Sequence, residues 1–292
     1  MVFSNLLFVF CFLPLNLLFY SIAPNIKAKN TVMLVFSLIF YAWGEPLYIL
    51  LMISMTAIDW YLTLLIEKNE GIYKRRRLLI LAVIGIDLLL LGIFKYGSFI
   101  LSNINLLTGF PKNIPSVALP IGISFYTFQL ITYCVDVYRG DVPAQKSFPT
   151  LLLYVSMFHQ CIAGPIVRYK DICAELTCRR TSYADCYEGV MRFTTGLFKK
   201  ALLANTCAML VSKLLVADGG DTAILSTRSG LALWIGVLSF SMQIYLDFSA
   251  YSDMAVGMGR MIGIHYTENF KYPYISRSIS EFWRRWHITL GS

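Results

Sequence analysis

Residues 78–101 read LLILAVIGIDLLLLGIFKYGSFIL and follow directly on the basic run Lys74-Arg75-Arg76-Arg77. A helix needs ~20 mainly apolar residues to cross the hydrocarbon core of a bilayer, and this stretch is long enough. Basic residues that flank such a run are typical of a loop on the cytoplasmic side of a membrane. The stretch therefore predicts a membrane-spanning helix.

Further apolar runs of spanning length lie at residues 3–23, 117–138 and 230–256. Residues 31–66 are too long for one span and are interrupted by Gly44-Glu45-Pro46; because proline stops a helix, they predict two short or tilted helices. The run 147–163 is short and ends in Ala163-Gly164-Pro165, which favours a re-entrant or half-length helix. Residues 188–216 combine an amphipathic start with a shorter apolar run.

The composition agrees with these runs, because 57% of the 292 residues are hydrophobic and only 14% are charged. A soluble domain of this size needs more polar surface. We therefore expect an all-α, polytopic membrane protein that forms one multi-pass domain over residues 1–292. The first 22 residues lack a preceding basic residue and are interpreted as an uncleaved anchor.

The net charge of +8 comes from basic residues that lie between the apolar runs. This distribution indicates cytoplasmic loops rather than a nucleic-acid surface, and it predicts an N-terminus outside the cell. Seven cysteines are present; the three that share one loop, Cys173, Cys178 and Cys186, do not have a usual zinc spacing. We expect free thiols and no metal site.

Polar side chains recur on two of the predicted spans, although lipid disfavours them. Tyr126, Gln129, Tyr133 and Asp136 share one helix face by their spacing of three and four. Along residues 230–256 the polar positions are Gln243, Asp247 and Tyr251, with Ser249 and Asp253 beside them. Such stripes could line a hydrated interior or only join helices by hydrogen bonds, and the residues alone favour neither. Asp87 is expected either to pair with a lysine such as Lys95 or to be protonated.

The C-terminal stretch carries a histidine beside aromatic and basic residues. Ser278-Ile279-Ser280-Glu281 has the form of a capping box and predicts a helix that continues through Phe282-Trp283-Arg284-Arg285-Trp286-His287-Ile288. In such a helix Trp283 and His287 share a face, and Arg284 lies one turn below the imidazole. A nearby positive charge keeps histidine neutral, the form that can accept a proton. The alternative is an interfacial belt of tryptophan and arginine that contains a histidine by chance.

Five ordered blocks resemble the membrane-bound O-acyltransferases, most closely those of the alginate O-acetyltransferase type. They are 119–129 with 136–140, 163–169, 196–200, 243–255 and 281–290, the last being EFWRRWHITL. The resemblance implies a ring of helices around a thin centre, and transfer of an acetyl or other acyl group from a cytoplasmic thioester to a hydroxyl outside. The donor would be acetyl-CoA or an acyl carrier, with no tightly bound cofactor. The acceptor would be a polysaccharide or an extracytoplasmic partner protein.

The same resemblance implies roles for particular residues. His287 matches the family's second, funnel-lining histidine; the principal catalytic histidine lies in a later block, beyond residue 292, so we expect this stretch alone to be an inactive fragment. We expect His287 to act on the acceptor hydroxyl or the thioester, with Trp283 and Arg284 around it. Gln243, Asp247, Tyr251 and Asp253 would line the adjoining path. The expected contacts to coenzyme A phosphates are Lys199, Lys200, Arg284 and Arg285, unless these four only set topology.

Two functions from other classes compete with this interpretation. A transporter or flippase would also need polar stripes, although no paired repeat of broken helices is evident. A non-catalytic scaffold for a secretion complex would leave the histidine stretch unexplained. For the acyltransferase we expect a bacterial inner (plasma) membrane location, with the lipid bilayer, the acyl donor and the acceptor as partners and no nucleic acid.

Overall fold

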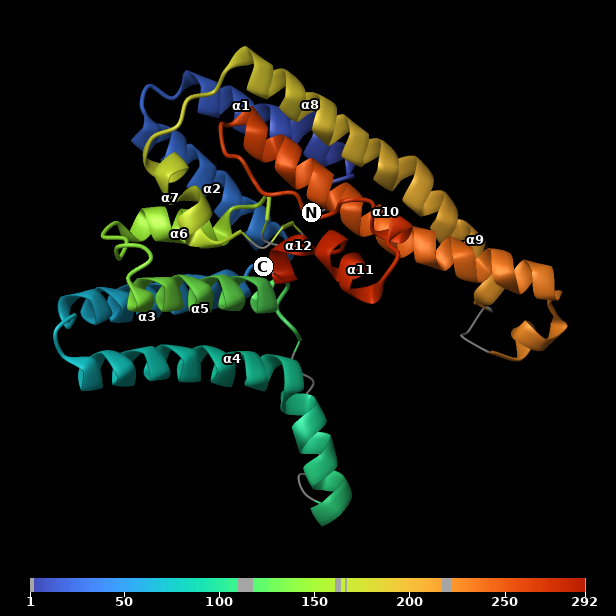
Figure 1. Ribbon diagram of the computed structural model, residues 1–292, viewed down its shortest axis with the longest axis horizontal. Coiled ribbons are helices and arrows are strands. Elements are labelled where there is room, and N and C mark those ends of the chain that lie inside the picture. Colours follow the sequence, from blue (N-terminus) through green and yellow to red (C-terminus); the bar gives the residue numbers. More distant parts are fainter. Residues whose placement is uncertain (1–2, 110–117, 161–163, 166, 217–221, 292) are drawn as a thin grey trace. The chain divides into compact units, whose positions relative to one another are not determined.

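A computed structural model describes residues 3–109, 118–160, 164–165, 167–216 and 222–291, and every regular element in these ranges is a helix (Figure 1). Three of the helices are long and apolar enough to cross a membrane: α3 (Tyr48–Lys68), α4 (Tyr73–Thr108) and α10 (Gly230–Met261). The predicted all-α, polytopic membrane class is therefore confirmed.

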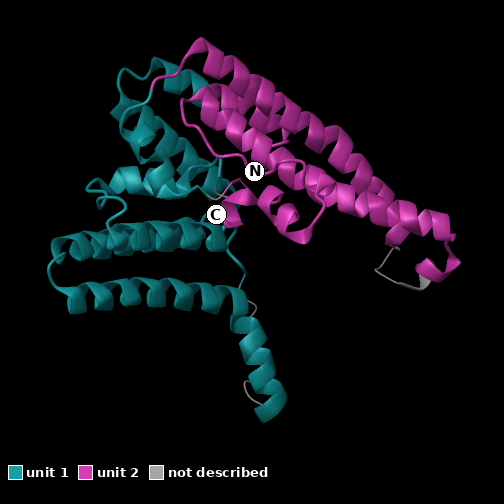
Figure 2. Ribbon diagram, in the orientation of Figure 1, with its two compact units in different colours: residues 1, 16–162, 166–179 teal, residues 2–15, 163–165, 180–292 magenta. Residues whose placement is uncertain are grey.

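The described residues form two compact units (Figure 2). Unit 1 contains residues 16–162 and 166–179, and unit 2 contains residues 2–15, 163–165 and 180–292. Each unit is described by itself below. The prediction of one domain over residues 1–292 stays a prediction.

Helix boundaries in the N-terminal half follow proline and glycine. A short π-helix, η1 (Phe8–Phe12), leads into α1 (Leu13–Ile22), and α2 (Ile26–Gly44) ends where α3 is about to begin. The predicted break at Gly44-Glu45-Pro46 is thus confirmed. Helix α4 ends at Gly109, whose φ of 70° suits a residue without a Cβ.

Two of the apolar runs contain helices that are shorter than the runs themselves. In the run 117–138, whose first residue lies outside the described ranges, α5 spans only Ile123–Arg139, because a turn at Pro120 and a left-handed Gly122 precede it. In the run 147–163, α6 (Phe148–Ser156) has nine residues, which confirms the half-length helix. Residues 161–163 and 166, which belong to this run and to the block that follows it, lie outside the described residues. Re-entrance therefore stays a prediction.

In unit 1 the helices α3, α4 and α5 pack against one another, as Figure 1 shows, and α6 packs on α2 and α3. The face that carries Tyr126, Gln129, Tyr133 and Asp136 is buried in this unit. Helix α7 (Tyr169–Thr177) completes unit 1 against α5.

In unit 2 one long helical segment runs beside α10 (Figure 1). It consists of α8 (Tyr183–Phe198), the π-helix η2 (Lys199–Ala204) and α9 (Asn205–Leu215). Ser182 and Asp185 form a reciprocal capping box at its start. Unit 2 also contains η1, and its remaining elements are η3 (Thr222–Thr227), η4 (Pro273–Ile275), α11 (Ile279–Arg285) and α12 (Ile288–Gly291).

The α8–α10 contact depends on small residues that let two backbones approach. A Cβ built on Gly189 would lie 2.7 Å from the carbonyl oxygen of Gly257, and one on Gly196 would lie 2.7 Å from that of Ala250. Both partners are backbone atoms, which cannot rotate away as a flexible side chain can. The spacing of seven residues on both helices keeps these small residues on the facing sides.

We expect Gly196→Ala in the full-length protein to lower the melting temperature, because the new methyl group forces α8 away from α10 at a cost of about 1–3 kcal/mol. Thermal unfolding in detergent or nanodiscs measures the change. The control is Gly97→Ala on α4, where a Cβ meets nothing within 4 Å and helix propensity is expected to be unchanged or improved. Equal melting temperatures for the two variants would contradict the close contact.

Candidate functional site

All ten residues that the sequence predicts for the site lie in unit 2. They fall into three groups: lysines on η2, polar residues on α10, and the segment around α11. The π-helix η2 is where the first two groups meet, because it packs on α10. π segments inserted in α-helices occur frequently at functional sites.

The two lysines of η2 each contact an acid on α10. Lys200 Nζ lies 2.7 Å from Asp247 Oδ1 and Lys199 Nζ lies 2.5 Å from Asp253 Oδ2. The two acids are six positions apart on α10, a rise of about 9 Å. Adjacent lysines therefore neutralise two acids that are almost two helical turns apart.

Asp253 belongs to a larger network that the sequence did not indicate. Its carboxylate also pairs with Arg192 of α8 at 2.6 Å, and Arg192 bridges to Glu268 at the same distance. Asp253 is 6% exposed. Buried within ion pairs to two cations, it is placed to hold α8, η2 and α10 together.

The polar stripe of α10 opens onto a shallow cavity. Gln243, Asp247 and Tyr251 line it together with Ile244 and Phe248, and its volume is about 330 Å³. The Oε1 atom of Gln243 is buried and has no hydrogen-bond partner among the described residues. The Lys200 ammonium lies 5.9 Å from the centre of the Tyr251 ring. The predicted common face of these three residues is confirmed, whereas Asp253 is outside the cavity wall.

We expect Lys200→Met in the full-length protein to destabilise it more than Lys200→Met combined with Asp247→Asn. The single change leaves a half-buried carboxylate without its cation, whereas the double change removes both charges. Melting temperatures measure the difference. Lys213→Met on α9 is the control, because Lys213 forms no ion pair among the residues that the structure describes. Asp247→Asn alone completes the comparison. If the effects of Lys200→Met and Asp247→Asn on the melting temperature simply add in the double variant, the pairing is contradicted.

Helix α11 begins where the sequence predicts, but it ends too early for the predicted geometry. Ser278 Oγ accepts a hydrogen bond from the Glu281 backbone N–H at 3.1 Å, while the Glu281 carboxylate accepts from the Arg277 N–H instead of completing the box. The helix stops at Arg285, Trp286 is extended, and His287 has a φ of 49°. The prediction that Trp283 and His287 share a helix face is therefore wrong.

The break follows from backbone hydrogen bonds to the preceding loop. Lys271 N–H donates to Arg285 O, and Ile288 N–H donates to Asn269 O, both at 3.0 Å. These bonds pair Phe270 with Trp286 as an isolated bridge. Because the loop supplies partners for backbone groups that a helix would otherwise use, tertiary contacts override the helical spacing. A non-glycine residue with positive φ is uncommon and costs of order 1–3 kcal/mol.

An aromatic cluster fixes this turn on α10. Trp286 contacts the rings of Phe270, Phe282, Tyr245 and Tyr274, and Tyr274 donates a hydrogen bond to Ser241 O of α10 at 2.7 Å. The ring that meets the imidazole is that of Phe248, edge to face with a centroid distance of 4.9 Å. Phe248 thus joins the cavity of α10 to His287.

Asn269 determines which nitrogen of His287 carries the proton. Its Oδ1 lies 3.1 Å from His287 Nδ1 and also accepts from the backbone N–H of Thr289 at 3.3 Å and its hydroxyl at 3.0 Å. The Thr289 N–H requires an acceptor, so this atom is the amide oxygen and Nδ1 must donate to it. In a neutral imidazole Nε2 is then the free acceptor.

Burial favours this neutral form. Desolvation lowers the pKa of His287 below its usual value. This is the direction that the sequence predicts for the pKa of His287, but its cause is burial and not the charge of Arg284. With Nδ1–H held by Asn269, the arrangement can accept a proton at Nε2 near neutral pH.

The other three predicted residues of the α11 segment lie elsewhere on it. Trp283 is 59% exposed, and its ring contacts Phe282. Arg285 pairs with Glu281 one turn earlier at 2.9 Å. Arg284 is exposed and makes no ion pair within the described part of the chain. The structure does not bring these three side chains to the imidazole.

Three residues that contact the predicted site were missed from sequence: Asn269, Phe248 and Arg192. Asn269 opens the aromatic, proline-containing stretch 269–274, a signal that could have been followed. Phe248 follows Asp247 directly but reads as an ordinary apolar residue of a spanning helix. Arg192 lies in the amphipathic start of the run 188–216, where a charge is unremarkable.

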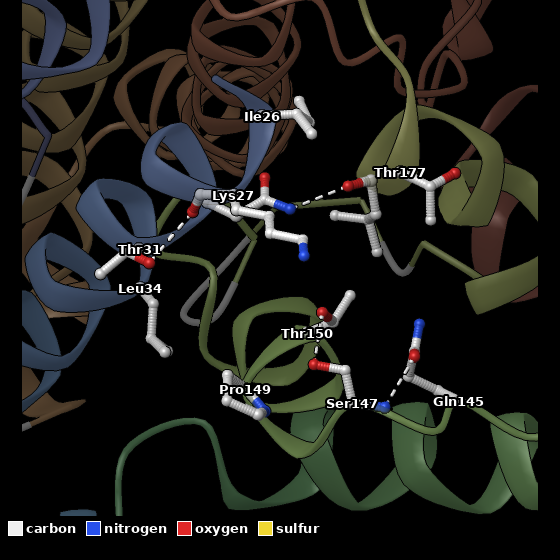
Figure 3. Close-up of a pocket in the computed structure, with 11 residues that line it drawn as sticks. Ile26, Lys27, Thr31, Leu34, Gln145, Ser147, Pro149, Thr150 and Thr177 are labelled. Carbon is white, nitrogen blue, oxygen red and sulfur yellow. Dashed lines mark hydrogen bonds between the residues drawn. The ribbon is translucent and has the colours of Figure 1, made fainter. Parts of the chain in front are cut away.

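A separate cavity of about 520 Å³ lies in unit 1, between α2, the start of α6 and the end of α7 (Figure 3). Lys27 is the only charged residue among the described residues of its wall, which also carries the hydroxyl groups of Thr31, Ser147, Thr150 and Thr177. Asn30 closes one side by donating to Leu176 O at 2.8 Å. None of the predicted site residues lines this cavity.

This fold and site define a helical membrane protein that holds a half-buried histidine beside a cavity with three polar residues in its wall. Residues 142–291 match the model of the MBOAT, membrane-bound O-acyltransferase family. The chain belongs to this family.

Curated relatives agree with that assignment. The chain is 40% identical over 296 residues to the probable alginate O-acetylase AlgI of Pseudomonas putida and 34% identical over 324 residues to the peptidoglycan O-acetyltransferase of Helicobacter pylori. It is 28% identical over 187 residues to the teichoic acid D-alanyltransferase of Bacillus subtilis, across 62% of this chain and 44% of that protein. The first two alignments cover the whole chain, which spans 59% and 60% of those relatives.

Proposed function

We propose that the protein is a membrane-bound O-acyltransferase that passes an acetyl group from a cytoplasmic thioester to a hydroxyl of an extracytoplasmic polysaccharide or partner protein. The observation that carries this proposal is the free Nε2 of a neutral His287, fixed by Asn269. Family membership supports it, and so do the names of the relatives, which specify acetyl or D-alanyl groups on alginate, peptidoglycan or teichoic acid.

In the proposed reaction His287 Nε2 accepts the proton of the acceptor hydroxyl as its oxygen attacks the thioester carbonyl. The new C–O bond forms, the C–S bond breaks, and the leaving thiolate takes up a proton. The polar wall of Gln243, Asp247 and Tyr251 would offer hydrogen bonds to the reacting groups, because the Gln243 oxygen has no competing partner among the described residues. The donor is acetyl-CoA or an acyl carrier.

We assign contact with the donor phosphates first to Arg284. Of the four basic residues predicted for this role, Lys199, Lys200 and Arg285 already pair with carboxylates. An exposed arginine without such a partner retains all its donors for a phosphate. We further propose a location in the bacterial inner membrane with the basic loops in the cytoplasm, following the distribution of lysine and arginine.

Vesicles that contain the full-length protein test the function. We expect transfer of radiolabelled acetyl from acetyl-CoA, or from an acetylated carrier protein, to an added polysaccharide acceptor, without uptake of free polar solutes. Transfer only in the presence of a partner protein would assign the acceptor side to that partner and still support the proposal. Substrate uptake with no acyl transfer under any of these conditions would replace it with a transporter.

A further inference from the structure

Two aspartates face each other inside the apolar part of unit 1. Asp59 lies on α3 and Asp87 on α4, the two helices are packed together, and both belong to the spanning set. Each aspartate is 0% exposed. The two carboxyl groups interact electrostatically with each other across the contact between α3 and α4.

Neither carboxyl group has a donor. All four oxygens of Asp59 and Asp87 are buried without a hydrogen-bond partner among the described residues. Lys95, which the sequence offers as a partner for Asp87, lies with its ammonium 5.6 Å from the centre of the Tyr96 ring and forms no ion pair with Asp87. The alternative of a lysine pair is therefore not supported.

The hydroxyls one turn before and one turn after Asp59 on α3 are already engaged. On α3 the Thr56 hydroxyl donates to Met52 O at 2.7 Å. Thr63 shares a hydrogen bond of 3.0 Å with the Cys134 thiol, which α5 contributes and which is the other titratable group that faces Asp59 and Asp87. The seam between α3, α4 and α5 thus offers the two carboxyls no cation, and these hydroxyls are committed elsewhere.

Two ionised carboxylates cannot remain together in such a place. Both are acceptors only, they repel, and each loses its hydration in an apolar interior. One proton removes the repulsion and supplies the missing donor, because a carboxylic acid donates to the remaining carboxylate in a short, charge-assisted hydrogen bond that offsets part of its lost hydration. Pairs of aspartates that share one proton are known in water-accessible sites as well.

We propose that Asp59 and Asp87 form a proton-binding site in which a single proton, shared between the two carboxyls, joins α3 to α4. A metal ion is a poorer occupant, because no group of three or more His, Cys, Asp or Glu residues gathers within the described ranges and hard cations require six or more oxygens. The site is separate from His287 and does not depend on the proposed acyl transfer.

Infrared spectroscopy of the full-length protein in lipid tests for the proton directly. At neutral pH we expect a carbonyl band of a protonated carboxylic acid that shifts in D₂O and on labelling with ¹³C-aspartate. Asp59→Asn and Asp87→Asn should each abolish it, because the new amide N–H supplies the donor that the remaining carboxylate needs. Asp171→Asn on the exposed part of α7 is the matched control and should leave the band unchanged.

The pH dependence of stability gives a second measurement. Folding takes up the shared proton, because the carboxyl groups of the unfolded chain are ionised. The ratio of folded to unfolded protein should therefore fall by up to tenfold for each unit that the pH rises through neutrality. Either asparagine variant should show a flatter dependence than the wild type. Absence of the infrared band in the wild type, its persistence in both variants, or stabilisation by sodium at constant pH would each overturn the proposal.

Discussion

Acetyl transfer by the full-length protein is expected to fall by about 10²- to 10⁴-fold when His287 is replaced by alanine, the range typical of a lost general base. Because Nδ1 donates to Asn269, the imidazole Nε2 is the nitrogen left to accept a proton in the turn after α11. Incorporation of labelled acetyl into the acceptor polysaccharide, normalised to the amount of folded protein, measures the effect.

Two variants separate chemistry from structure. His287 has a φ of 49°, which alanine tolerates less well than asparagine does, so His287→Asn should retain the turn and still lose activity. His265→Ala is the matched histidine control: its imidazole lies 3.7 Å from Asp185 in the same unit and is half exposed. Unchanged transfer in both His287 variants would remove this residue from the reaction.

Asn269 is expected to act through His287, as a positioning residue that sets the tautomer of the imidazole. Asn269→Leu removes the acceptor of three donors, so we expect a fall in transfer of at least tenfold, together with loss of the turn's stability. Asn269→Leu alone does not distinguish the loss of a contact that positions His287 from misfolding of the turn.

Asn269→Asp makes that distinction through the pH profile. The substituted carboxylate still accepts all three hydrogen bonds, but its negative charge stabilises the imidazolium and raises the pKa of His287, which burial lowers in the wild type. A base is active only above its pKa. The acid limb of kcat/KM should therefore move to higher pH, with activity at high pH largely preserved; an unshifted limb would show that Asn269 does not contact the reacting imidazole.

Much of the fold follows from local sequence, because a bilayer allows few alternatives to apolar helices. The break at Gly44-Glu45-Pro46 and the start of α11 at Ser278 depend on proline and on a cap, which act within one helical turn. The short extent of α5 depends on Pro120 and Gly122 and was also readable in principle.

The site was predictable in its composition but not in its geometry. Trp283 and His287 have helical spacing, yet backbone bonds from Asn269 and Lys271 end the helix between them, and no local pattern indicates those bonds. Likewise, the residue that we propose to share a proton with Asp87 lies on another helix, and only the packing of α3 on α4 suggests it. The sequence indicates that a buried polar side chain needs a partner. It does not indicate which residue that partner is when the two are distant in the chain.

The π-helix η2 has a consequence for how the long segment beside α10 tolerates change. A π turn accommodates an additional residue, so the residues of α8 and those of α9 meet α10 in two different phases. Closing that turn into ordinary α geometry would rotate everything after Ala204 by about 100° relative to α8, so that Gly189 and Gly196 would keep their alignment with α10 while the residues of α9 would lose theirs. The extra residue of the π turn therefore sets the rotational offset between α8 and α9. Each of these two helices has its own alignment with α10.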